Sequence, residues 1–435
     1  MLNGKKVAYY TLGCKLNFSE TSTISRQLED IGFIKTNFDN KADLYVINTC
    51  SVTENANKEC RRIIRKVKRT APESMVVITG CYAQLKPESI SVIEGVDMVV
   101  GANDKFKIPD LLKNYKPKTT EIHGCSINNL DYHSSFSLND RTRSFLKIQD
   151  GCDYTCSYCT IPFARGKSRC DSIENIVSNA NKIAKNGITE IVITGVNIGD
   201  YKYEDKKFID VIKQLEKVKG ITRYRISSIE PNLITDEIIE FVRKSSKFMP
   251  HFHIPLQSGS DVILAKMRRR YNSELYRNKI LKIYNEIPNV SIGVDVIVGF
   301  PDETDIEFTE SMNFIKDLPV SYLHVFSYSE RENTKALLLK NPVDKYKRSE
   351  RSKILRMLSS KLQRNFYLKS LGTTKNVLFE QEDKNGFLFG FTENYIKIKV
   401  PFNKTLSKTQ QEVYITDYND DLTMNVKLLE TCIQQ

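Results

Sequence analysis

Short apolar segments alternate with amphipathic polar segments along most of this chain, and this alternation restricts the fold more than any other feature. A chain that alternates strands with helices folds as a parallel sheet with helices on its faces. In the first 110 residues the strands are predicted at 5–13, 42–49, 74–80 and 96–102, and the helices at 19–33 and 54–69. The sequence therefore predicts an α/β fold that begins with a doubly wound parallel-sheet domain.

A second series of strands and helices runs from about residue 144 to 330. Its strands are predicted at 144–149, 189–195, 223–229, 251–257, 292–300 and 322–328, with helices at 172–187, 207–220 and 274–287 between them. Six strand–helix units in succession indicate a partial (β/α)6 barrel. Both open and barrel-type parallel sheets bind ligands at the carboxyl ends of their strands, so the site is expected there.

The remaining segments set the expected domain boundaries. Residues 113–143 are polar and lack periodicity, which is typical of a linker. Residues 345–370 read as one basic helix, and after Gly372 four short β segments predict a small β-barrel. We expect an N-terminal domain at 1–115, a linker at 116–143, a central domain at 144–370 and a C-terminal domain at 371–435.

Length and charge restrict the class of protein. A chain of 435 residues is longer than one ordinary core supports, so two or three domains are expected. Its 65 Lys and Arg exceed its 53 Asp and Glu, which suits a polyanion such as RNA but is equally typical of a soluble basic protein. The apolar runs are too short to span a bilayer, and the first residues lack the apolar stretch of a signal peptide. We therefore expect a cytoplasmic protein without membrane contact.

The strongest chemical signal is a loop of cysteines directly after the first strand of the second series. Cys152, Cys156 and Cys159 form a C-x3-C-x2-C pattern. Three thiolates in such a loop hold three irons of a cubane cluster and leave the fourth iron open to a substrate. A structural zinc site normally closes with a fourth Cys or His, and the next cysteine, Cys170, is distant. The loop therefore predicts an iron–sulfur cluster rather than a zinc knot.

A second set of cysteines is dispersed in the sequence but occupies equivalent positions. Cys14, Cys50 and Cys81 each follow the carboxyl end of a predicted strand of the N-terminal domain. In a parallel sheet these ends lie side by side, at the edge where ligands bind. A single cysteine at such a strand end would be expected only to fill a packing gap beneath a loop. Three cysteines at equivalent strand ends favour a second iron–sulfur cluster. The cysteines expected to be merely structural are Cys60, Cys125, Cys170 and Cys432.

The Cys152 loop resembles the signature of the radical S-adenosylmethionine (SAM) superfamily, and the resemblance extends over residues 144–330. It implies that the ends of the barrel strands contact the cofactor. The strand ends at Thr194, Ser228 and Asp295 are expected to meet its methionine amino group, its ribose and its adenine, respectively. The implied cofactor-binding residues are Tyr158, Thr194, Gly195, Asn197, Ser228, Glu230, Gln257, Asp295, Gly299 and Phe326.

Over its whole length the chain resembles the radical SAM methylthiotransferase family. The matching stretches are the Cys152 loop and residues 13–17, 48–50, 79–84, 253–259 and 267–271. That family has an N-terminal three-cysteine cluster domain, a radical SAM domain and a C-terminal TRAM domain, a small β-barrel that binds RNA. The sequence TLGCKLN at residues 11–17 most resembles that of the MtaB branch of the family. The chain departs from many relatives at Asn333, where they have Gly.

The resemblance implies a reaction with its cofactors and partners. The enzyme would transfer a methylthio group to C2 of N6-threonylcarbamoyladenosine at position 37 of tRNA. Cys14, Cys50 and Cys81 would hold one 4Fe–4S cluster, and the Cys152 loop would hold another that cleaves SAM to a 5′-deoxyadenosyl radical. The implied partners are the anticodon loop of tRNA and a one-electron donor of the flavodoxin or ferredoxin type, and the family precedent is a monomer.

Basic segments are candidates for contact with the tRNA, although a charged helix face is more often simply solvated. They are residues 58–69, residues 268–270, the helix from 345 and the C-terminal β module. Phe387, Phe389 and Phe391 alternate in that module and could stack on bases, but such aromatics usually belong to the core of a small barrel.

Other functions stay open from the sequence alone. A relative in the same family could act on N6-isopentenyladenosine in tRNA or on an aspartate of a ribosomal protein. A non-enzymatic iron–sulfur protein with an RNA-binding tail would produce no 5′-deoxyadenosine from SAM. A zinc-dependent RNA-binding protein would be colourless after anaerobic purification.

Overall fold

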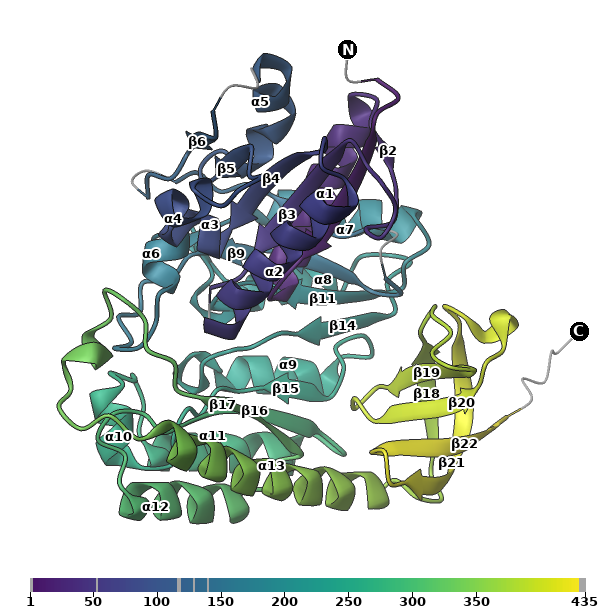
Figure 1. Cartoon of the computed structure of the whole chain (residues 1–435). Helices are drawn as coiled ribbons and strands as arrows, with labels where there is room; N and C mark the ends of the chain where they lie inside the picture. The colour runs from purple at the N-terminus through teal and green to yellow at the C-terminus, as the bar shows by residue number, and fades with distance from the viewer. Residues whose placement is uncertain (1–2, 52–53, 116–118, 128–129, 139–140, 430–435) are drawn as a thin grey trace, which may run out of the picture.

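A computed structural model describes residues 3–51, 54–115, 119–127, 130–138 and 141–429 of the chain (Figure 1). A parallel sheet with its helices comes first, a longer series of strands and helices follows, and a small barrel ends the chain. The predicted fold class is thereby confirmed. Within the described ranges, no helix combines the length and the apolar character needed to cross a membrane.

The N-terminal part is one parallel sheet because each apolar strand is followed by a segment that crosses back over a face. Its six strands lie in the order β2-β1-β3-β4-β5-β6. They are β1 (Lys6–Thr11), β2 (Ile34–Lys35), β3 (Leu44–Thr49), β4 (Met75–Gly80), β5 (Met98–Val100) and β6 (Glu121–His123). The helices are α1 (Lys15–Asp30), α2 (Glu54–Thr70), α3 (Cys81–Leu85), α4 (Pro87–Ser91) and α5 (Ile108–Asn114).

Two separate cores cover the two faces of this sheet. Ile24 of α1 and Ile108 of α5 pack on one face, whereas Ile63 and Ile64 of α2 pack on the other. Alternate residues of each strand enter alternate cores, as the twofold period of a strand requires. This is the doubly wound arrangement that the sequence predicts.

The structure differs from the sequence prediction at several boundaries. Helix α1 begins at Lys15 instead of residue 19, directly after Cys14. Inside the predicted linker, β6 pairs with β5, and β7 (Ser135–Phe136) pairs with β8 (Ser144–Lys147). These strands have two or three residues each, too few for an alternating pattern to show in the sequence.

The central part contains all six predicted barrel strands, in parallel order. They are β8, β11 (Glu190–Thr194), β14 (Arg223–Ile226), β15 (His251–His253), β16 (Ser291–Val298) and β17 (Tyr322–Ser327). Backbone hydrogen bonds join β8, β11 and β14 into one group and β15, β16 and β17 into another, and a parallel bridge between Ser228 and His253 connects the two groups. The outer helices are α7 (Ile173–Lys185), α8 (Phe208–Leu215), α9 (Asp236–Lys244), α11 (Ser273–Glu286), α12 (Asp305–Lys316) and α13 (Lys345–Leu368).

Shorter elements connect these units. They are β9 (Gln149–Asp150), α6 (Ile161–Arg165), β10 (Arg169–Cys170), β12 (Lys202–Tyr203), β13 (Lys206–Lys207) and α10 (Asp261–Lys266). Asn333, where many relatives have Gly, has a φ of 64°. Asn tolerates this left-handed conformation better than most residues, so the departure from the family pattern leaves the loop intact.

The C-terminal part is a closed barrel of five strands in the order β18-β19-β20-β22-β21. They are β18 (Thr374–Phe379), β19 (Phe387–Thr392), β20 (Lys397–Pro401), β21 (Gln410–Asn419) and β22 (Thr423–Leu428). The last strand, β22, was not predicted. The expectation that the phenylalanines of β19 form the core is wrong, because Leu388 is the β19 residue in the core cluster. Phe387 is 37% exposed.

The C-terminal barrel docks on the central part through two buried arginines of β14. Arg223 donates a hydrogen bond to the backbone carbonyl of Phe391 at 3.1 Å. Arg225 donates to the carbonyls of Thr392 at 2.8 Å and Glu393 at 2.9 Å. Arg225 is also paired with the buried Glu190, whose Oε1 lies 2.9 Å from its Nε. Side chains of the barrel contribute as well, because Arg223 also donates to Oδ1 of Asn376 at 2.5 Å and the ring of Tyr395 stacks on His251 of β15.

Candidate active site

The two predicted cysteine sets lie on either side of the boundary between the N-terminal and central parts. Cys50 and Cys81 directly follow β3 and β4, and Cys14 comes shortly after the end of β1 at Thr11. Helix α6 begins just after Cys159, and it packs against α3, which begins at Cys81. The carboxyl ends of the N-terminal sheet therefore face the segment that carries the Cys152 loop.

Close approach of the N-terminal strand ends requires glycine at two turns. Gly13 has a φ of 99°, and a Cβ there would lie 2.7 Å from Cβ of Cys50 and 3.0 Å from its sulfur. Gly80 has a φ of 95°, and a Cβ there would lie 2.4 Å from the carbonyl oxygen of Thr49. The turns that precede Cys14 and Cys81 thus pack against the end of β3, which brings the three segments together.

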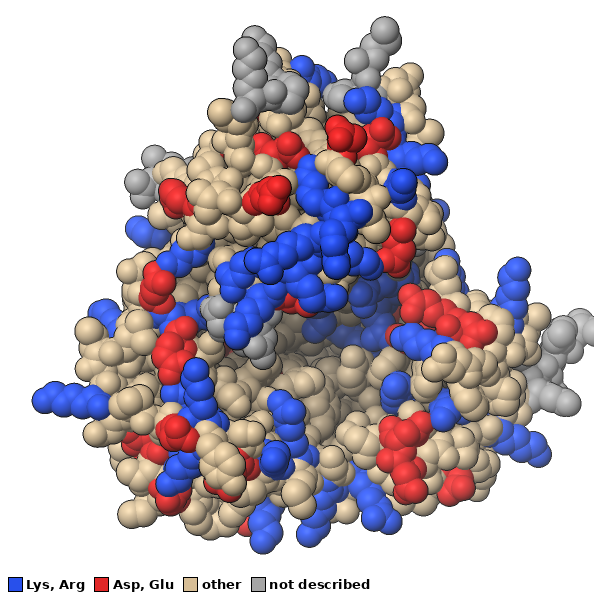
Figure 2. Space-filling model, viewed as in Figure 1, with Lys and Arg blue, Asp and Glu red and all other residues tan. Residues whose placement is uncertain are grey.

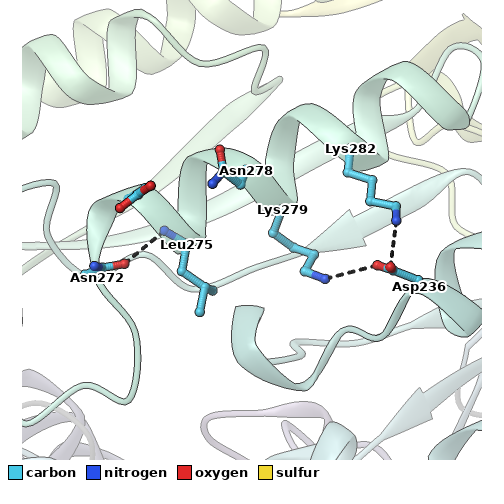
Figure 3. A pocket seen from close by; sticks show the side chains of 7 residues that line it. Asp236, Asn272, Leu275, Asn278, Lys279 and Lys282 are labelled. Carbon is cyan, nitrogen blue, oxygen red and sulfur yellow. Dashed lines mark hydrogen bonds and ion pairs between the residues drawn. The ribbon is translucent and has the colours of Figure 1, made fainter.

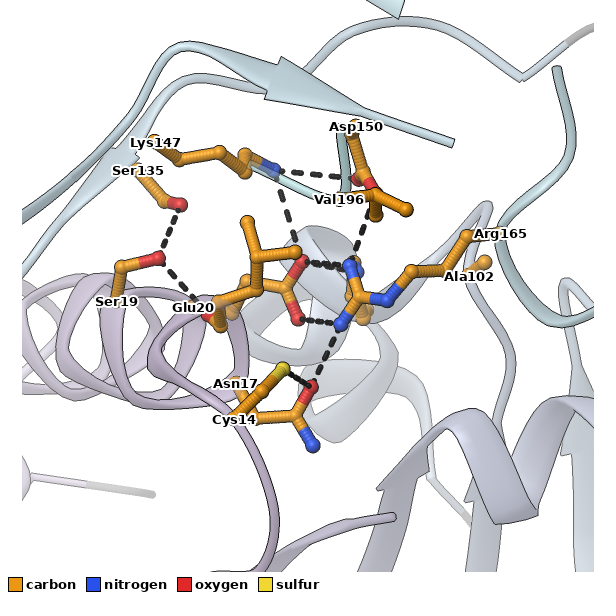
Figure 4. A network of polar contacts seen from close by, with 12 residues as sticks. Cys14, Asn17, Ser19, Glu20, Ala102, Ser135, Lys147, Asp150, Arg165 and Val196 are labelled. Atoms are coloured by element: carbon orange, nitrogen blue, oxygen red, sulfur yellow. Dashed lines mark hydrogen bonds and ion pairs between the residues drawn. The ribbon is translucent and has the colours of Figure 1, made fainter. Parts of the chain in front are cut away.

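Arg165, at the end of α6, reaches across the boundary into this region (Figure 4). Its guanidinium donates to Oδ1 of Asn17 at 2.6 Å, to Glu20 at 2.9 and 3.2 Å, and to Oδ1 of Asp150 at 3.0 Å. Asn17 in turn donates to the backbone carbonyl of Thr49, one residue before Cys50. One side chain of the central part is thereby bonded to the residues that surround the N-terminal cysteines.

The electrostatics around Cys81 follow from the same arrangement. Burial raises the pKa of the Cys81 thiol, whereas the positive charge of Arg165 lowers it. The sulfur of Cys14 lies 3.9 Å from Oδ1 of Asn17. A thiolate at either position would therefore have a buried cation nearby, which favours metal ligation.

The Cys152 loop directs N–H donors at its sulfurs. The backbone N–H of Tyr154 points to Cys152 at 3.4 Å, and that of Ile161 points to Cys159 at 3.5 Å. Nη1 of Arg269 lies 3.1 Å from the sulfur of Cys156. Burial nevertheless raises the pKa of Cys152 to about 11 and that of Cys159 to about 12. The donors suit sulfurs that carry negative charge, and a metal would supply the charge that keeps them ionised.

The types of donor in the two cysteine sets are those of an iron–sulfur cluster. Among the residues that the structure describes, no three His, Cys, Asp or Glu side chains are placed to hold one metal ion. In a cubane each thiolate binds a different iron, so the three sulfurs need not converge on one point. The donor set of three thiols without imidazole or carboxylate fits an iron–sulfur cluster, which stays a prediction.

The strand end at Thr194 to Asn197 presents a side chain without partners. The side-chain amide of Asn197 is buried, and neither its oxygen nor its nitrogen has a hydrogen-bond partner among the residues that the structure describes. Gln149 fixes the backbone there, because its Oε1 accepts from the N–H groups of Val196 and Asn197 at 2.9 Å. A bound polar ligand would satisfy the Asn197 amide, so the predicted contact with SAM fits. Gln149 was not predicted, because it lies outside the strand-end motif at residues 194–197 and contacts only the backbone of that motif.

Glu230, one of the predicted cofactor residues, is paired with Arg269. Arg269 also lies 3.4 Å from the hydroxyl of Tyr158, another predicted cofactor residue. Its side chain is 3% exposed, so the prediction that it belongs to a basic surface for tRNA is wrong. Arg268 and Arg270 are exposed and remain candidates for that surface. The sequence alone does not distinguish Arg269 from Arg268 and Arg270, because no pattern indicates which of three consecutive arginines is buried.

The other predicted cofactor residues lie on β16 and β17 or just after the ends of β14, β15 and β16. Nε2 of His253 lies 2.8 Å from Oδ1 of Asp295. The backbone N–H of Gln257 donates to the carbonyl of Asp295 at 2.8 Å, and Gly299 packs so closely on α13 that a Cβ would lie 2.2 Å from Arg348. Phe326 is 44% exposed. Ser228 takes part in the bridge between β14 and β15, so its backbone is fixed.

The cysteines outside the two sets lie in different surroundings. Cys60 is fully buried in the core beneath α2, and burial raises its pKa to about 12. The sulfur of Cys125 lies 3.4 Å from the backbone carbonyl of His123. Cys170 accepts from the backbone N–H of Lys202 at 3.4 Å. Cys432 lies outside the described residues.

A surface depression between α9 and α11 is unrelated to these groups (Figure 3). Asp236 and Lys282 form an ion pair across it at 2.7 Å, and Asn272 caps the N-terminus of α11. Neither cysteines nor predicted cofactor residues line it. The candidate site is therefore the boundary between the N-terminal and central parts.

Comparison with protein families identifies the relatives of two parts of the chain. Residues 6–101 match the uncharacterized protein family UPF0004, and residues 146–315 match the radical SAM superfamily. The chain is 38% identical to the threonylcarbamoyladenosine tRNA methylthiotransferase MtaB of Bacillus subtilis (strain 168), over 90% of this chain and 89% of the relative. It is 32% identical to the tRNA-2-methylthio-N(6)-dimethylallyladenosine synthase of Endomicrobium trichonymphae, over 89% of this chain and 91% of that relative.

Solved structures show a similar fold at low sequence identity. The radical SAM methyltransferase TsrM from Kitasatospora setae, with tryptophan and a SAM analogue bound, aligns with a TM-score of 0.56 at 12% identity, over 74% of this chain and 73% of TsrM. A second structure of TsrM, with cobalamin and a [4Fe-4S] cluster bound, gives a TM-score of 0.55 at 13% identity, over 74% and 75%. At this identity the likeness establishes the fold alone.

Proposed function

This chain belongs to the family of radical SAM tRNA methylthiotransferases, and we propose that it acts on N6-threonylcarbamoyladenosine at position 37 of tRNA. The observation that carries the choice of substrate is the higher identity to the relative named for threonylcarbamoyladenosine than to the one named for dimethylallyladenosine. The product would be 2-methylthio-N6-threonylcarbamoyladenosine.

The cysteines would hold the cofactors of this reaction. Cys152, Cys156 and Cys159 would bind the 4Fe–4S cluster at which SAM is held, and Cys14, Cys50 and Cys81 would bind a second cluster. When bound, these groups supply the radical and sulfur chemistry that replaces the C2–H of adenine, which no side chain activates as an acid or a base. The fit rests on the donors aimed at the sulfurs and on the buried Asn197 amide, for which the described part of the chain supplies no hydrogen-bond partner.

The protein's own contribution is to fix these sites with respect to each other. Arg165 joins the segment after Cys159 to Asn17 and Glu20, which follow Cys14 on α1. Glu20, Asp150 and Arg165 are each at most 2% exposed, so water does not compete for these bonds. A fixed separation in a dry site is what a transfer between two cofactors requires.

A basic helix face beside the site supports tRNA as the substrate. Lys58, Arg62, Arg65 and Arg69 are exposed and recur at helical spacing on α2. Figure 2 shows Lys and Arg side chains gathered over α2, above a hollow between the N-terminal and central parts. Such a row would bind phosphates of the anticodon stem while the unpaired adenosine enters the hollow.

The C-terminal barrel would provide a second RNA contact, as a TRAM domain does. The outward phenylalanines of β19 are covered by lysines of β20. Lys397 lies 4.3 Å from the ring centre of Phe389, and Lys399 lies 4.3 Å from that of Phe387. Aromatic rings interleaved with cations suit single-stranded RNA, because they offer both stacking faces and charge.

Analysis of tRNA nucleosides by mass spectrometry tests the proposal. The tRNA would come from a host that lacks the activity, carrying an empty vector, the gene or its Cys152→Ala variant. We expect 2-methylthio-N6-threonylcarbamoyladenosine only with the intact gene. A methylthiolated isopentenyladenosine instead would reassign the substrate, and unchanged tRNA would direct the search to ribosomal proteins. Product formation by the Cys152→Ala variant would contradict the role of the Cys152 loop.

A further inference from the structure

A short helix between β17 and α13 rests directly on the Cys152 loop. This helix, η4 (Lys335–Leu338), belongs to the green segment at the left of Figure 1. The backbone N–H of Ala336 donates to the carbonyl of Ser157 at 2.8 Å, and Ser157 immediately follows Cys156. One hydrogen bond therefore joins the backbone of η4 to a residue that adjoins a predicted cluster ligand.

The inner side of η4 is fixed by burial. Ala336 is fully buried in an apolar cluster that includes Met267, and Tyr158 packs against this cluster. Ser157 continues the contact, because its N–H donates to the carbonyl of Met267 at 3.0 Å. The helix therefore has a defined position over the segment between Cys156 and Cys159.

The outer side of η4 presents leucines to the solvent. Leu338 is 81% exposed, and Leu337 is 44% exposed. Adjacent exposed apolar side chains mark an interaction site more often than scattered single ones do. Aliphatic side chains offer RNA neither a stacking face nor a charge, so this surface favours a protein partner.

Lysines flank these leucines on both sides. Lys335 and Lys340 are exposed, and neither forms an ion pair within the described ranges of the chain. An apolar centre with a charged rim is the usual composition of a protein–protein contact. We give the name η4 surface to the residues Lys335, Leu337, Leu338 and Lys340.

The acidic residues between β17 and η4 do not cancel this positive charge. Glu332 is paired with Lys86, and Glu330 is paired with Arg348 at 2.6 Å. The acidic charges of the segment are thus compensated, whereas those of the two lysines are not. The η4 surface therefore complements an acidic partner.

Reductive cleavage of SAM at the Cys152 loop consumes one electron, which has to come from another molecule. The N-terminal part covers the α6 side of the loop, because α6 packs against α3. A carrier that approaches from the side of Ser157 meets η4 first. Complexes between electron-transfer proteins bury less than about 1,200 Å2, so a compact surface suits this class of partner.

We propose that the η4 surface is the docking site of the one-electron donor, a small acidic protein whose redox centre lies near its own surface. The donor loses one electron and the 4Fe–4S cluster of the Cys152 loop gains it, and no bond forms or breaks in this step. The net charge of +12 attracts such a donor at long range, and the leucines fill the centre of the contact. The assignment rests on the proposed function for the cluster alone and does not involve tRNA.

Binding of a purified flavodoxin and a purified ferredoxin, both acidic, tests this assignment. Each would carry a fluorescent label, and anisotropy would measure its Kd for the cluster-containing protein at low ionic strength. We expect at least one of them to bind the wild type. Leu338→Asp and Lys335→Glu should each raise that Kd about tenfold, because each adds a negative charge that repels the acidic partner.

Two control variants carry the same kinds of change elsewhere. Met357→Asp alters an apolar residue of α13 that is 73% exposed. Lys219→Glu alters an exposed lysine before the amino end of β14, whereas the Cys152 loop follows the carboxyl end of β8. Both should leave the Kd unchanged, and the iron content and visible spectrum of all four variants should equal those of the wild type.

Formation of 5′-deoxyadenosine with two kinds of reductant shows whether docking is the step that the variants impair. Dithionite is a small molecule that needs no docking surface, whereas the reduced protein donor does. We expect Leu338→Asp to retain the rate with dithionite and to lose about tenfold with the protein donor, in line with its Kd.

The outcomes distinguish the two proposals. Equal Kd values for the wild type and Leu338→Asp, or no binding of either donor to the wild type, would overturn the role of the η4 surface and leave the proposed function standing. A parallel loss of rate with dithionite would also overturn that role, because Leu338 would then act on the cluster.

Two other occupants of the η4 surface are tested with the same variants. A loss of affinity of Leu338→Asp for a tRNA anticodon stem-loop would make this surface an RNA contact and overturn the assignment. Self-association of the wild type that Leu338→Asp abolishes would overturn it as well. A wild type that forms no 5′-deoxyadenosine with either reductant would instead contradict the proposed function.

Discussion

Arg165 and Glu20 form a buried ion pair with two contacts across the boundary between the central and N-terminal parts. Nη1 lies 2.9 Å from Oε1, and Nη2 lies 3.2 Å from Oε2. Burial alone would raise the pKa of Glu20, but Arg165, Lys105 and Lys147 hold it at about 2. Glu20 is therefore ionised at neutral pH, and the pair links the segment after Cys159 to helix α1, which follows Cys14.

Glu20→Gln should destabilise the protein strongly. The change leaves Arg165, Lys105 and Lys147 buried with one anion fewer, and we expect the free energy of unfolding to fall by about 3–5 kcal/mol. Urea denaturation at pH 7 measures it. Glu237→Gln is the matched control, because Glu237 pairs with Lys213 on the surface and such pairs contribute little. Equal losses for both variants would contradict a stabilising role for the buried network.

Arg165→Lys should uncouple cofactor cleavage from transfer. Lysine retains the charge, but one ammonium cannot replace the planar fork that bonds to Asn17, Glu20 and Asp150. We expect more 5′-deoxyadenosine per methylthio group transferred, because the two cysteine sets would be less well aligned. Quantifying both products in one reaction gives the ratio. A parallel fall of both products would show that Arg165 acts on cleavage instead.

Arg269→Met should make the cluster of the Cys152 loop harder to reduce. Arg269 donates to the sulfur of Cys156 at 3.1 Å, and a donor to a ligating sulfur stabilises the more negative, reduced state. We expect the midpoint potential to fall by on the order of 50 mV, because tenfold in a one-electron equilibrium corresponds to about 59 mV. A redox titration followed by electron paramagnetic resonance measures it. Lys266→Met on the neighbouring helix α10 should leave the potential unchanged.

His251 should make the protein less stable in mild acid. Burial, and then Arg225, His253, Lys15 and Arg143, lower its pKa well below 6.5, and its ring stacks on Tyr395 at 4.5 Å. The folded protein keeps this ring neutral, whereas the unfolded chain protonates it below pH 6.5. Its contribution to stability is therefore complete above pH 6.5 and declines as the pH falls, by about 1.4 kcal/mol per pH unit.

Comparison with His251→Phe isolates this titration, because phenylalanine can stack on Tyr395 but binds no proton. Urea denaturation of both proteins at pH 7.5 and pH 5.5 gives four free energies of unfolding. The wild type should lose about 1.4 kcal/mol more than the variant between these pH values. Equal losses would mean that His251 accepts a proton in the folded state.

Sequence patterns predicted the fold better than they predicted the contacts of the site. The six barrel strands and the N-terminal sheet follow from apolar segments of sufficient length, whereas β6, β7 and β22 are too short or too polar to stand out. Cys14, Cys50 and Cys81 were predicted to lie close together because the carboxyl ends of parallel strands meet at one edge of the sheet. Arg165 and Gln149 were missed, since their importance depends on partners far away in the sequence.

The C-terminal barrel and the N-terminal part differ in how freely evolution could exchange them. Arg223 and Arg225 hold the C-terminal barrel through main-chain oxygens, which every amino acid provides. A barrel grafted from a relative would therefore need the same backbone path and, in addition, the few side chains that contact the central part. These are Asn376, bonded to Arg223, Glu380, paired with Arg143, and Tyr395, stacked on His251. The N-terminal part is held through the side chains of Glu20 and Asn17, so a chimera at that boundary must transfer Arg165 together with its acceptors.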